Sequence, residues 1–167
     1  MTAGRPTVRV IGLGNAYRGD DAIGLEVSRE VGRRMPEIDT VAGVADGTML
    51  LDLWTQADLC IVVDCAVSGQ AAGTIHRFDG LRQRIPAGLF SSFSTHAYSI
   101  PGAIELGKAL GRLPGGLVVY AIEGATFACG ARIAAPVLEA AENVIAQIEA
   151  EIRMHQQRND HAKSRPA

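Results

Sequence analysis

Four aspartates and one histidine are the residues whose types and spacing best suit chemistry. Asp20 and Asp21 follow a glycine-rich loop, Asp46 precedes a Gly-Thr pair, Asp64 ends a run of apolar residues, and His96 closes a long irregular segment. Carboxylates and an imidazole together form a mixed oxygen and nitrogen ligand set. Such a set suits a divalent transition metal that keeps open positions for water or substrate.

The elements that must position these residues alternate between strands and helices. Short β-branched or apolar runs predict buried strands, and apolar residues at four-residue spacing predict helices. The predicted strands are residues 8–11, 40–44, 59–63, 74–78 and 117–122. The predicted helices are residues 22–35, 49–56, a segment ending near 110, and 136–154.

This alternation predicts an α/β fold: a three-layer sandwich with a mostly parallel, twisted sheet of about five strands and helices on both faces. Only about ten residues separate strand 59–63 from strand 74–78, too few for a helical crossover, so we expect the latter to be an antiparallel edge strand. Right-handed crossovers would place the first and third strands side by side. Asp21 and Asp64 would then converge, and His96 would approach them from the following loop.

A nucleotide-binding loop is the obvious alternative for the first glycine-rich segment. Gly12-Leu13-Gly14 begins the pattern G-x-G-x-x-G, but Tyr17 stands where the third glycine belongs. No Gly-Lys-Ser/Thr follows, and carboxylates beside a phosphate would repel it. A nucleotide-binding α/β domain is therefore the less favoured alternative.

Several of the candidate residues also have a purely structural interpretation. In the structural interpretation, Asp20 and Asp21 are helix caps and have no further role. For Asp46, a hydrogen bond to its own turn is favoured over metal ligation. Cys65 is a candidate nucleophile, but no histidine base is evident beside it, so a buried thiol is favoured. The remaining histidines are interpreted as solvated: His76, His155 and His161.

Composition limits the class of protein. The chain has 167 residues, 47% hydrophobic content and a net charge of −2. These values predict one compact domain over residues 1–154 and a disordered polar tail over residues 155–167. Without a basic stripe, and with only 5% aromatic residues, we expect no nucleic-acid partner. We also expect no membrane segment, because no apolar run approaches about 20 residues. Three cysteines and no signal pattern favour the cytoplasm.

The ordered set of motifs resembles a known family, the [NiFe]-hydrogenase maturation proteases, which are endopeptidases that trim the C-terminus of the hydrogenase large subunit. The resemblance covers residues 8–148 in order. The segments that carry it are Gly12-Leu13-Gly14-Asn15, Asp20-Asp21-Ala22-Ile23-Gly24, Asp46-Gly47-Thr48, Val62-Val63-Asp64 with Gly73-Thr74, Ser94-Thr95-His96, and the strand 118–123.

The resemblance implies that Asp21, Asp64 and His96 bind nickel and form the catalytic site. It also implies that this nickel belongs to the substrate, the immature large subunit, so that the protease recognises it rather than keeping it. Binding of another divalent metal by the isolated protein is left open, and we expect a monomer. The chain departs from many members at residues 97–101 and in the less acidic loop 125–130, which bears on substrate choice.

Two questions stay open at this point. A nickel-sensing or chaperone module for the same partner would need the same metal site without cleavage. The group that attacks the peptide bond is also not identified, because there is no Ser-His-Asp set and no H-E-x-x-H helix. A metal-polarised carbonyl or water is one option, and Asp21 or Asp64 as general base is another.

Overall fold

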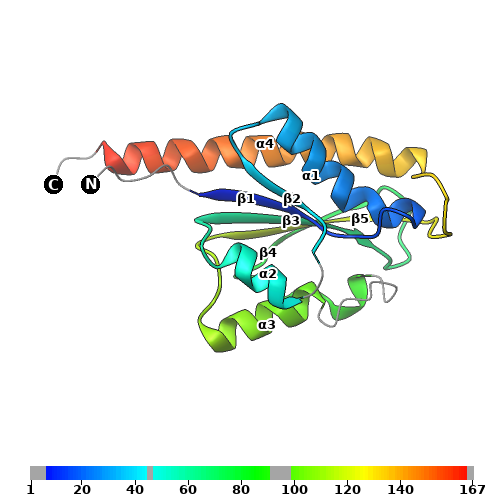
Figure 1. Cartoon of the computed structure of the whole chain (residues 1–167), viewed down its shortest axis with the longest axis horizontal. Helices are drawn as coiled ribbons and strands as arrows, with labels where there is room; N and C mark the ends of the chain where they lie inside the picture. Colours follow the sequence, from blue (N-terminus) through cyan, green and yellow to red (C-terminus); the bar gives the residue numbers. More distant parts are fainter. Residues whose placement is uncertain (1–6, 45–46, 91–98, 165–167) are drawn as a thin grey trace.

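One five-stranded sheet forms the centre of the protein (Figure 1). The computed structural model describes residues 7–44, 47–90 and 99–164. The strands lie in the order β2-β1-β3-β5-β4. Their bounds are Val8–Gly12 for β1, Asp39–Ala42 for β2, Leu59–Ala66 for β3, Ile75–Asp79 for β4 and Leu117–Glu123 for β5.

The pairing of the strands confirms the predicted topology. β1 pairs in parallel with both β2 and β3, and β3 pairs in parallel with β5. β4 is the antiparallel edge strand beside β5. The chain leaves β1 toward one side for β2 and returns to the other side for β3, so the sheet reverses its winding between β1 and β3. Ligands in open α/β sheets bind beyond the carboxyl ends of the strands at such a reversal.

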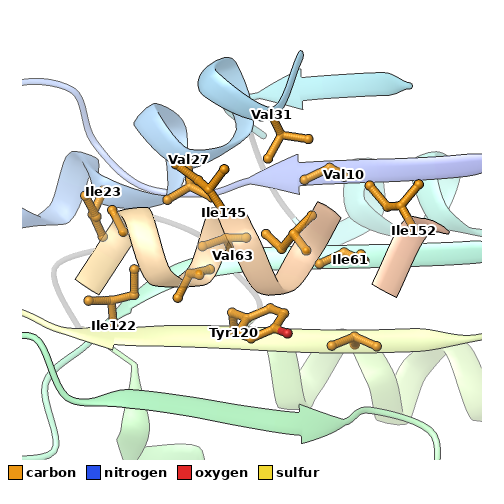
Figure 2. Close-up of a cluster of buried hydrophobic side chains, with 14 of the residues drawn as sticks. Val10, Ile23, Val27, Val31, Ile61, Val63, Tyr120, Ile122, Ile145 and Ile152 are labelled. Carbon is orange, nitrogen blue, oxygen red and sulfur yellow. The ribbon is translucent and has the colours of Figure 1, made fainter. Parts of the chain in front are cut away.

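Alternate side chains of the strands divide between two apolar layers. One layer packs the sheet against α1 (Ile23–Arg34) and α4 (Ala135–Lys163). Figure 2 shows residues of this layer: Val10, Ile61, Val63, Tyr120 and Ile122 from the strands, Ile23, Val27 and Val31 from α1, and Ile145 and Ile152 from α4. Because consecutive strand residues face opposite sides, β3 up to Val63 and β5 up to Ile122 can be apolar and buried on both faces.

The opposite layer packs the sheet against α2 (Gly47–Trp54) and α3 (Ile100–Leu110), which lie on the other side in Figure 1. The fully buried indole of Trp54 donates through Nε1 to the carbonyl of Arg112, 2.9 Å away. α3 begins at Ser99, whose hydroxyl accepts the N–H of Gly102, and ends at Gly111, which has φ 64°. These are the usual capping residues of a helix. The predicted three-layer sandwich is therefore confirmed.

Gly24 allows α1 to approach the sheet closely. A Cβ at this position would lie 2.3 Å from the carbonyl oxygen of Leu13 and 2.4 Å from that of Val63. Any larger residue would force α1 away from the ends of β1 and β3. The short 3-10 helix η1 (Gly19–Ala22), which leads into α1, is thereby held over the same ends.

The C-terminal segment differs from its prediction. Residues from His155 onward are polar, which predicts a disordered tail, but α4 continues to Lys163. Two features support the longer helix: most residues after Met154 have good helix propensity, and the side chains of His155 and Asn159, one turn apart, lie 3.0 Å from each other. In Figure 1 the red end of α4 extends beyond the ends of the strands. A polar sequence here forms a surface helix, since only one face needs apolar contact.

The remaining differences are at the ends of elements. β2 ends at Ala42 and α2 begins at Gly47, each about two residues earlier than predicted. Within the segment predicted as irregular, Ala87–Leu89 forms the short 3-10 helix η2. Among the described residues, no helix is both long and apolar enough to cross a membrane.

Candidate functional site

Asp21 and Asp64 lie at the carboxyl ends of neighbouring strands. Asp21 belongs to η1, is 2% exposed, and its Oδ2 accepts the N–H of Asn15 at 3.1 Å. Asp64 is part-buried in β3, and its Oδ1 accepts the N–H of Cys65 at 2.7 Å. The loop that carries Asp21 crosses β3 just before Asp64, because the N–H of Leu13 donates to the carbonyl of Val63 at 2.8 Å.

The charge of Asp21 acts on Asp64. Burial raises the pKa of Asp64 to about 7, and the nearby Asp21 carboxylate raises it further, while the N–H of Cys65 acts in the opposite direction. A raised pKa of a carboxyl means that its negative charge is poorly compensated by the surroundings. A cation placed between the two carboxylates would supply that compensation. The pair is therefore a candidate cation site.

Asp20 is also buried but has a different role. Its Oδ2 accepts the N–H groups of Ala125 and Thr126 at 2.8 and 2.9 Å, and its Oδ1 accepts the N–H of Ala134 at 2.7 Å. Its own N–H donates to the carbonyl of Thr126 at 2.8 Å. Both carboxylate oxygens are thus occupied by backbone donors. Asp20 anchors the loop 124–134 to η1, rather than capping its own helix.

Glu123 is the second fully buried carboxylate with several partners. It accepts the backbone N–H and the hydroxyl of Ser68, and it lies 3.0 Å from His76 Nε2. The ring of His76 stacks on Phe78, with the ring centroids 6.5 Å apart. The prediction that His76 is solvated is therefore wrong: its side chain is 15% exposed and pairs with Glu123 across the β4–β5 ladder.

Cys65 lies between these carboxylates and is fully buried. Burial raises its pKa well above the ordinary value, and the charges of Asp64, Asp21, Asp20 and Glu123 raise it further. Only the thiolate is a strong nucleophile. This environment matches the interpretation of Cys65 as a buried thiol rather than as the attacking group.

Two of the predicted site residues, His96 and Asp46, lie outside the described residues. The described segments on both sides of residues 91–98 are nevertheless placed. Phe90 forms an isolated antiparallel bridge with Ala66, the last residue of β3, and the N–H of Val67 donates to the carbonyl of Leu89 at 2.8 Å. Within the described part of the chain, no three His, Cys, Asp or Glu side chains are grouped as metal ligands.

The sequence predicts Asp21 and Asp64 as neighbours, but it does not predict the roles of Asp20 and Glu123. Their partners are 47 to 114 residues away along the chain, so no local motif marks them. The only available signal is their position next to the predicted site residues or at the end of a buried strand.

The comparisons with known proteins agree on one family. A sequence model described as hydrogenase maturation protease matches residues 25–151, about three quarters of the chain. The match begins after Asp20 and Asp21 and includes the positions of Asp64 and His96. No curated protein matches the chain in sequence.

Solved structures with the same fold include three hydrogenase maturation enzymes. The hydrogenase maturating endopeptidase HybD from E. coli has 21% identity and a TM-score of 0.75, covering 89% of this chain and 93% of its own. HybD from Thermococcus kodakarensis has 17% identity and a TM-score of 0.66, covering 86% and 97%. HycI from Thermococcus kodakarensis KOD1 has 20% identity and a TM-score of 0.62, covering 87% and 92%.

These likenesses show the fold, and the family model, which spans most of the chain, shows the family. The chain belongs to the hydrogenase maturation proteases and is a peptidase.

Proposed function

We propose that this protein is the endopeptidase that removes the C-terminal peptide of a nickel-loaded [NiFe]-hydrogenase large subunit. In this proposal, Asp21, Asp64 and His96 recognise nickel that the large subunit already carries. The partner is the immature large subunit, and nickel is part of the substrate. A cytoplasmic location and a monomeric state remain predictions.

The observation that carries the proposal is the contrast among four carboxylates, of which Asp20, Asp21 and Glu123 are buried and Asp64 is part-buried. Asp20 has three backbone donors, and Glu123 is paired with Ser68 and His76. Asp64, by contrast, has a raised pKa of about 7 because of burial and the charge of Asp21. Asp64 and Asp21 are thus the pair that a cation would stabilise most, and they lie where the sheet reverses its winding.

The chain connection of His96 supports its inclusion in the site. Phe90 is bridged to Ala66, two residues after Asp64, and His96 follows Phe90 by six residues. Six residues of extended chain span at most about 20 Å. The chain length therefore permits His96 to reach Asp64, and a neutral imidazole is a suitable third ligand for nickel beside two carboxylates.

The test is cleavage of a nickel-loaded large-subunit precursor, followed by mass spectrometry of its C-terminus. The wild type should release a C-terminal fragment, whereas Asp64→Asn and Asp21→Asn should slow release by at least about 10–100-fold, since even the outer-shell partners of metal ligands typically contribute that much. Glu105→Gln is the matched control, because Glu105 is an exposed carboxylate paired only with Lys108 on α3. It should cleave like the wild type.

Two outcomes would contradict the proposal. If the wild type binds the precursor but releases no fragment, the protein is a non-cleaving nickel-sensing or chaperone module. If both aspartate variants cleave at the rate of the Glu105→Gln control, the site lies elsewhere.

A further inference from the structure

Tyr17 is the most exposed of the large hydrophobic residues that the structure describes, with 79% of its surface accessible. Its backbone is nevertheless fixed on both sides. Its N–H donates to Asn15 Oδ1 at 2.9 Å, and its carbonyl accepts the N–H of Gly130 at 2.9 Å. An aromatic side chain displayed from a fixed backbone loses little conformational entropy when a partner covers it.

An uncharged strip of the neighbouring loop lies beside Tyr17. We define this strip by its exposed residues Ala125, Thr126, Ala128, Cys129 and Gly130. Besides the Gly130 bond to Tyr17, the strip is joined to the Asp20 carboxylate through the N–H groups of Ala125 and Thr126. In Figure 1 the dark blue loop after β1 and the yellow loop before α4 lie together at the same end of the sheet.

The helices on one side of the sheet offer a very different surface. Arg34 of α1 pairs with Glu30 of the same helix and with Glu142 of α4, and Arg153 pairs with Glu149. Covering such charges removes water from them, which opposes docking of a partner.

The residues of the strip and Tyr17 carry no charge of their own. The charges nearest to them in the chain are Arg18, whose Nε donates to the carbonyl of Phe127 at 3.4 Å, and the exposed Arg132. Covering Tyr17 and the strip therefore desolvates fewer charges than covering the paired helices, and Tyr17 is joined through Asn15 to the Asp21 carboxylate.

We infer that Tyr17 and the uncharged strip form the surface on which the polypeptide substrate docks, with Tyr17 as its aromatic anchor. The inference rests on the proposed function and names the contact that holds the large-subunit precursor while its nickel meets the carboxylates. An anchor of this kind packs against an apolar side chain of the partner, and a few such residues supply most of the binding energy of an interface.

The experiment compares Tyr17→Ala, Tyr17→Phe and Leu110→Ala as full-length proteins. The probe is a nickel-loaded large-subunit precursor, and both its binding and the KM and kcat of its cleavage are measured. Leu110 is the control because it is 57% exposed and ends α3. The segment that follows α3 bonds to the residues before β3, at the opposite end of the sheet.

Tyr17→Ala removes the ring and should weaken binding of the precursor and raise KM about tenfold. Its kcat should stay within about twofold of the wild type, because an anchor acts on association rather than on the chemical step. Tyr17→Phe keeps the ring and should stay within about twofold in KM, as should Leu110→Ala. Thermal unfolding of Tyr17→Ala should match the wild type, since the side chain is largely exposed.

A KM of Tyr17→Ala equal to that of Leu110→Ala, with a wild type that cleaves, would overturn the docking inference and leave the proposed function standing. An equal loss in kcat and kcat/KM would also overturn it, because Tyr17 would then act on the chemical step. If the wild type neither binds nor cleaves the precursor, the proposed function fails, and the docking inference fails with it.

Discussion

At the scale of single residues, environment separates carboxylates that look alike in the sequence. Asp20 and Asp21 are adjacent and equally acidic by type, yet Asp20 is saturated by three backbone N–H groups, while Asp21 contributes to the raised pKa of Asp64. A helix-capping interpretation treats both aspartates alike. The difference arises from residues 125–134, which no local pattern connects to the first loop.

The raised pKa of Asp64 predicts a specific pH dependence of stability. The pKa rises from 3.8 in the unfolded chain to about 7 in the folded protein. The folded state therefore holds a proton that the unfolded state releases, and the wild type loses stability as the pH rises from about 4 through 7. Asn at position 64 does not titrate. In chelator-treated samples, the free energy of unfolding of Asp64→Asn minus that of the wild type should increase by about 4 kcal/mol between pH 4 and pH 8, since each unit of pKa difference corresponds to about 1.4 kcal/mol.

Urea denaturation at several pH values measures this difference, with Glu105→Gln as the control for loss of an exposed carboxylate. Parallel curves for the wild type and Asp64→Asn would show that Asp64 is not perturbed.

The cysteines should differ sharply in reactivity. Cys60 and Cys65 are fully buried, and burial raises the pKa of Cys60 to about 12, whereas Cys129 is exposed. At pH 8 a thiol reagent such as DTNB should therefore react quickly with one thiol in the folded protein and with all three in guanidinium. Cys129→Ser should abolish the fast reaction. Rapid labelling of a second thiol in the native protein would contradict the buried placement.

At the scale of elements, the loop 124–134 depends on one side chain. Asp20 is fully buried and accepts three backbone N–H groups from this loop. Replacing the carboxylate with the amide of Asn leaves an N–H₂ group facing backbone donors. Since hydrogen bonds to charged groups contribute about 1.5–3 kcal/mol each, Asp20→Asn should lower the free energy of unfolding by about 2–4 kcal/mol.

Chemical denaturation measures that loss. Relative to the wild type, hydrogen exchange in Asp20→Asn should accelerate more at residues 125–134 than in β3 or β5. Asp52→Asn is a suitable comparison, because the side chain of Asp52 is 66% exposed and pairs with Arg112 at the surface. Such pairs contribute about 0–1 kcal/mol. Equal stability losses in the two variants would mean that Asp20 does not anchor the loop.

At the scale of the whole molecule, the fold follows from patterns that are visible in the sequence. The fully apolar runs of β3 and β5 predict central parallel strands, and the short connection after β3 predicts the antiparallel edge strand β4. The tail was harder to predict, because a polar segment can form either coil or a surface helix that continues from a packed one. The partners of Glu123 were equally hard to predict, because they come together only when β3, β4 and β5 are assembled.

The proposed function of the whole molecule depends on nickel carried by the substrate. The charge of Asp21 disfavours the charged form of Asp64, and a cation would relieve this effect. Under the proposal, three side chains without a thiolate would hold nickel less firmly than a thiolate site on the partner. Completing the metal's ligand set would then act as a checkpoint that admits only loaded precursor to cleavage.

The most direct measurement treats the enzyme alone with a chelator, removes the chelator, and adds either nickel-loaded or nickel-free large-subunit precursor without further metal. Mass spectrometry of the precursor's C-terminus then reports cleavage. If nickel on the substrate is required, the nickel-loaded precursor should lose its C-terminal peptide and the nickel-free precursor should stay intact. Cleavage of the nickel-free precursor at a comparable rate would contradict this requirement.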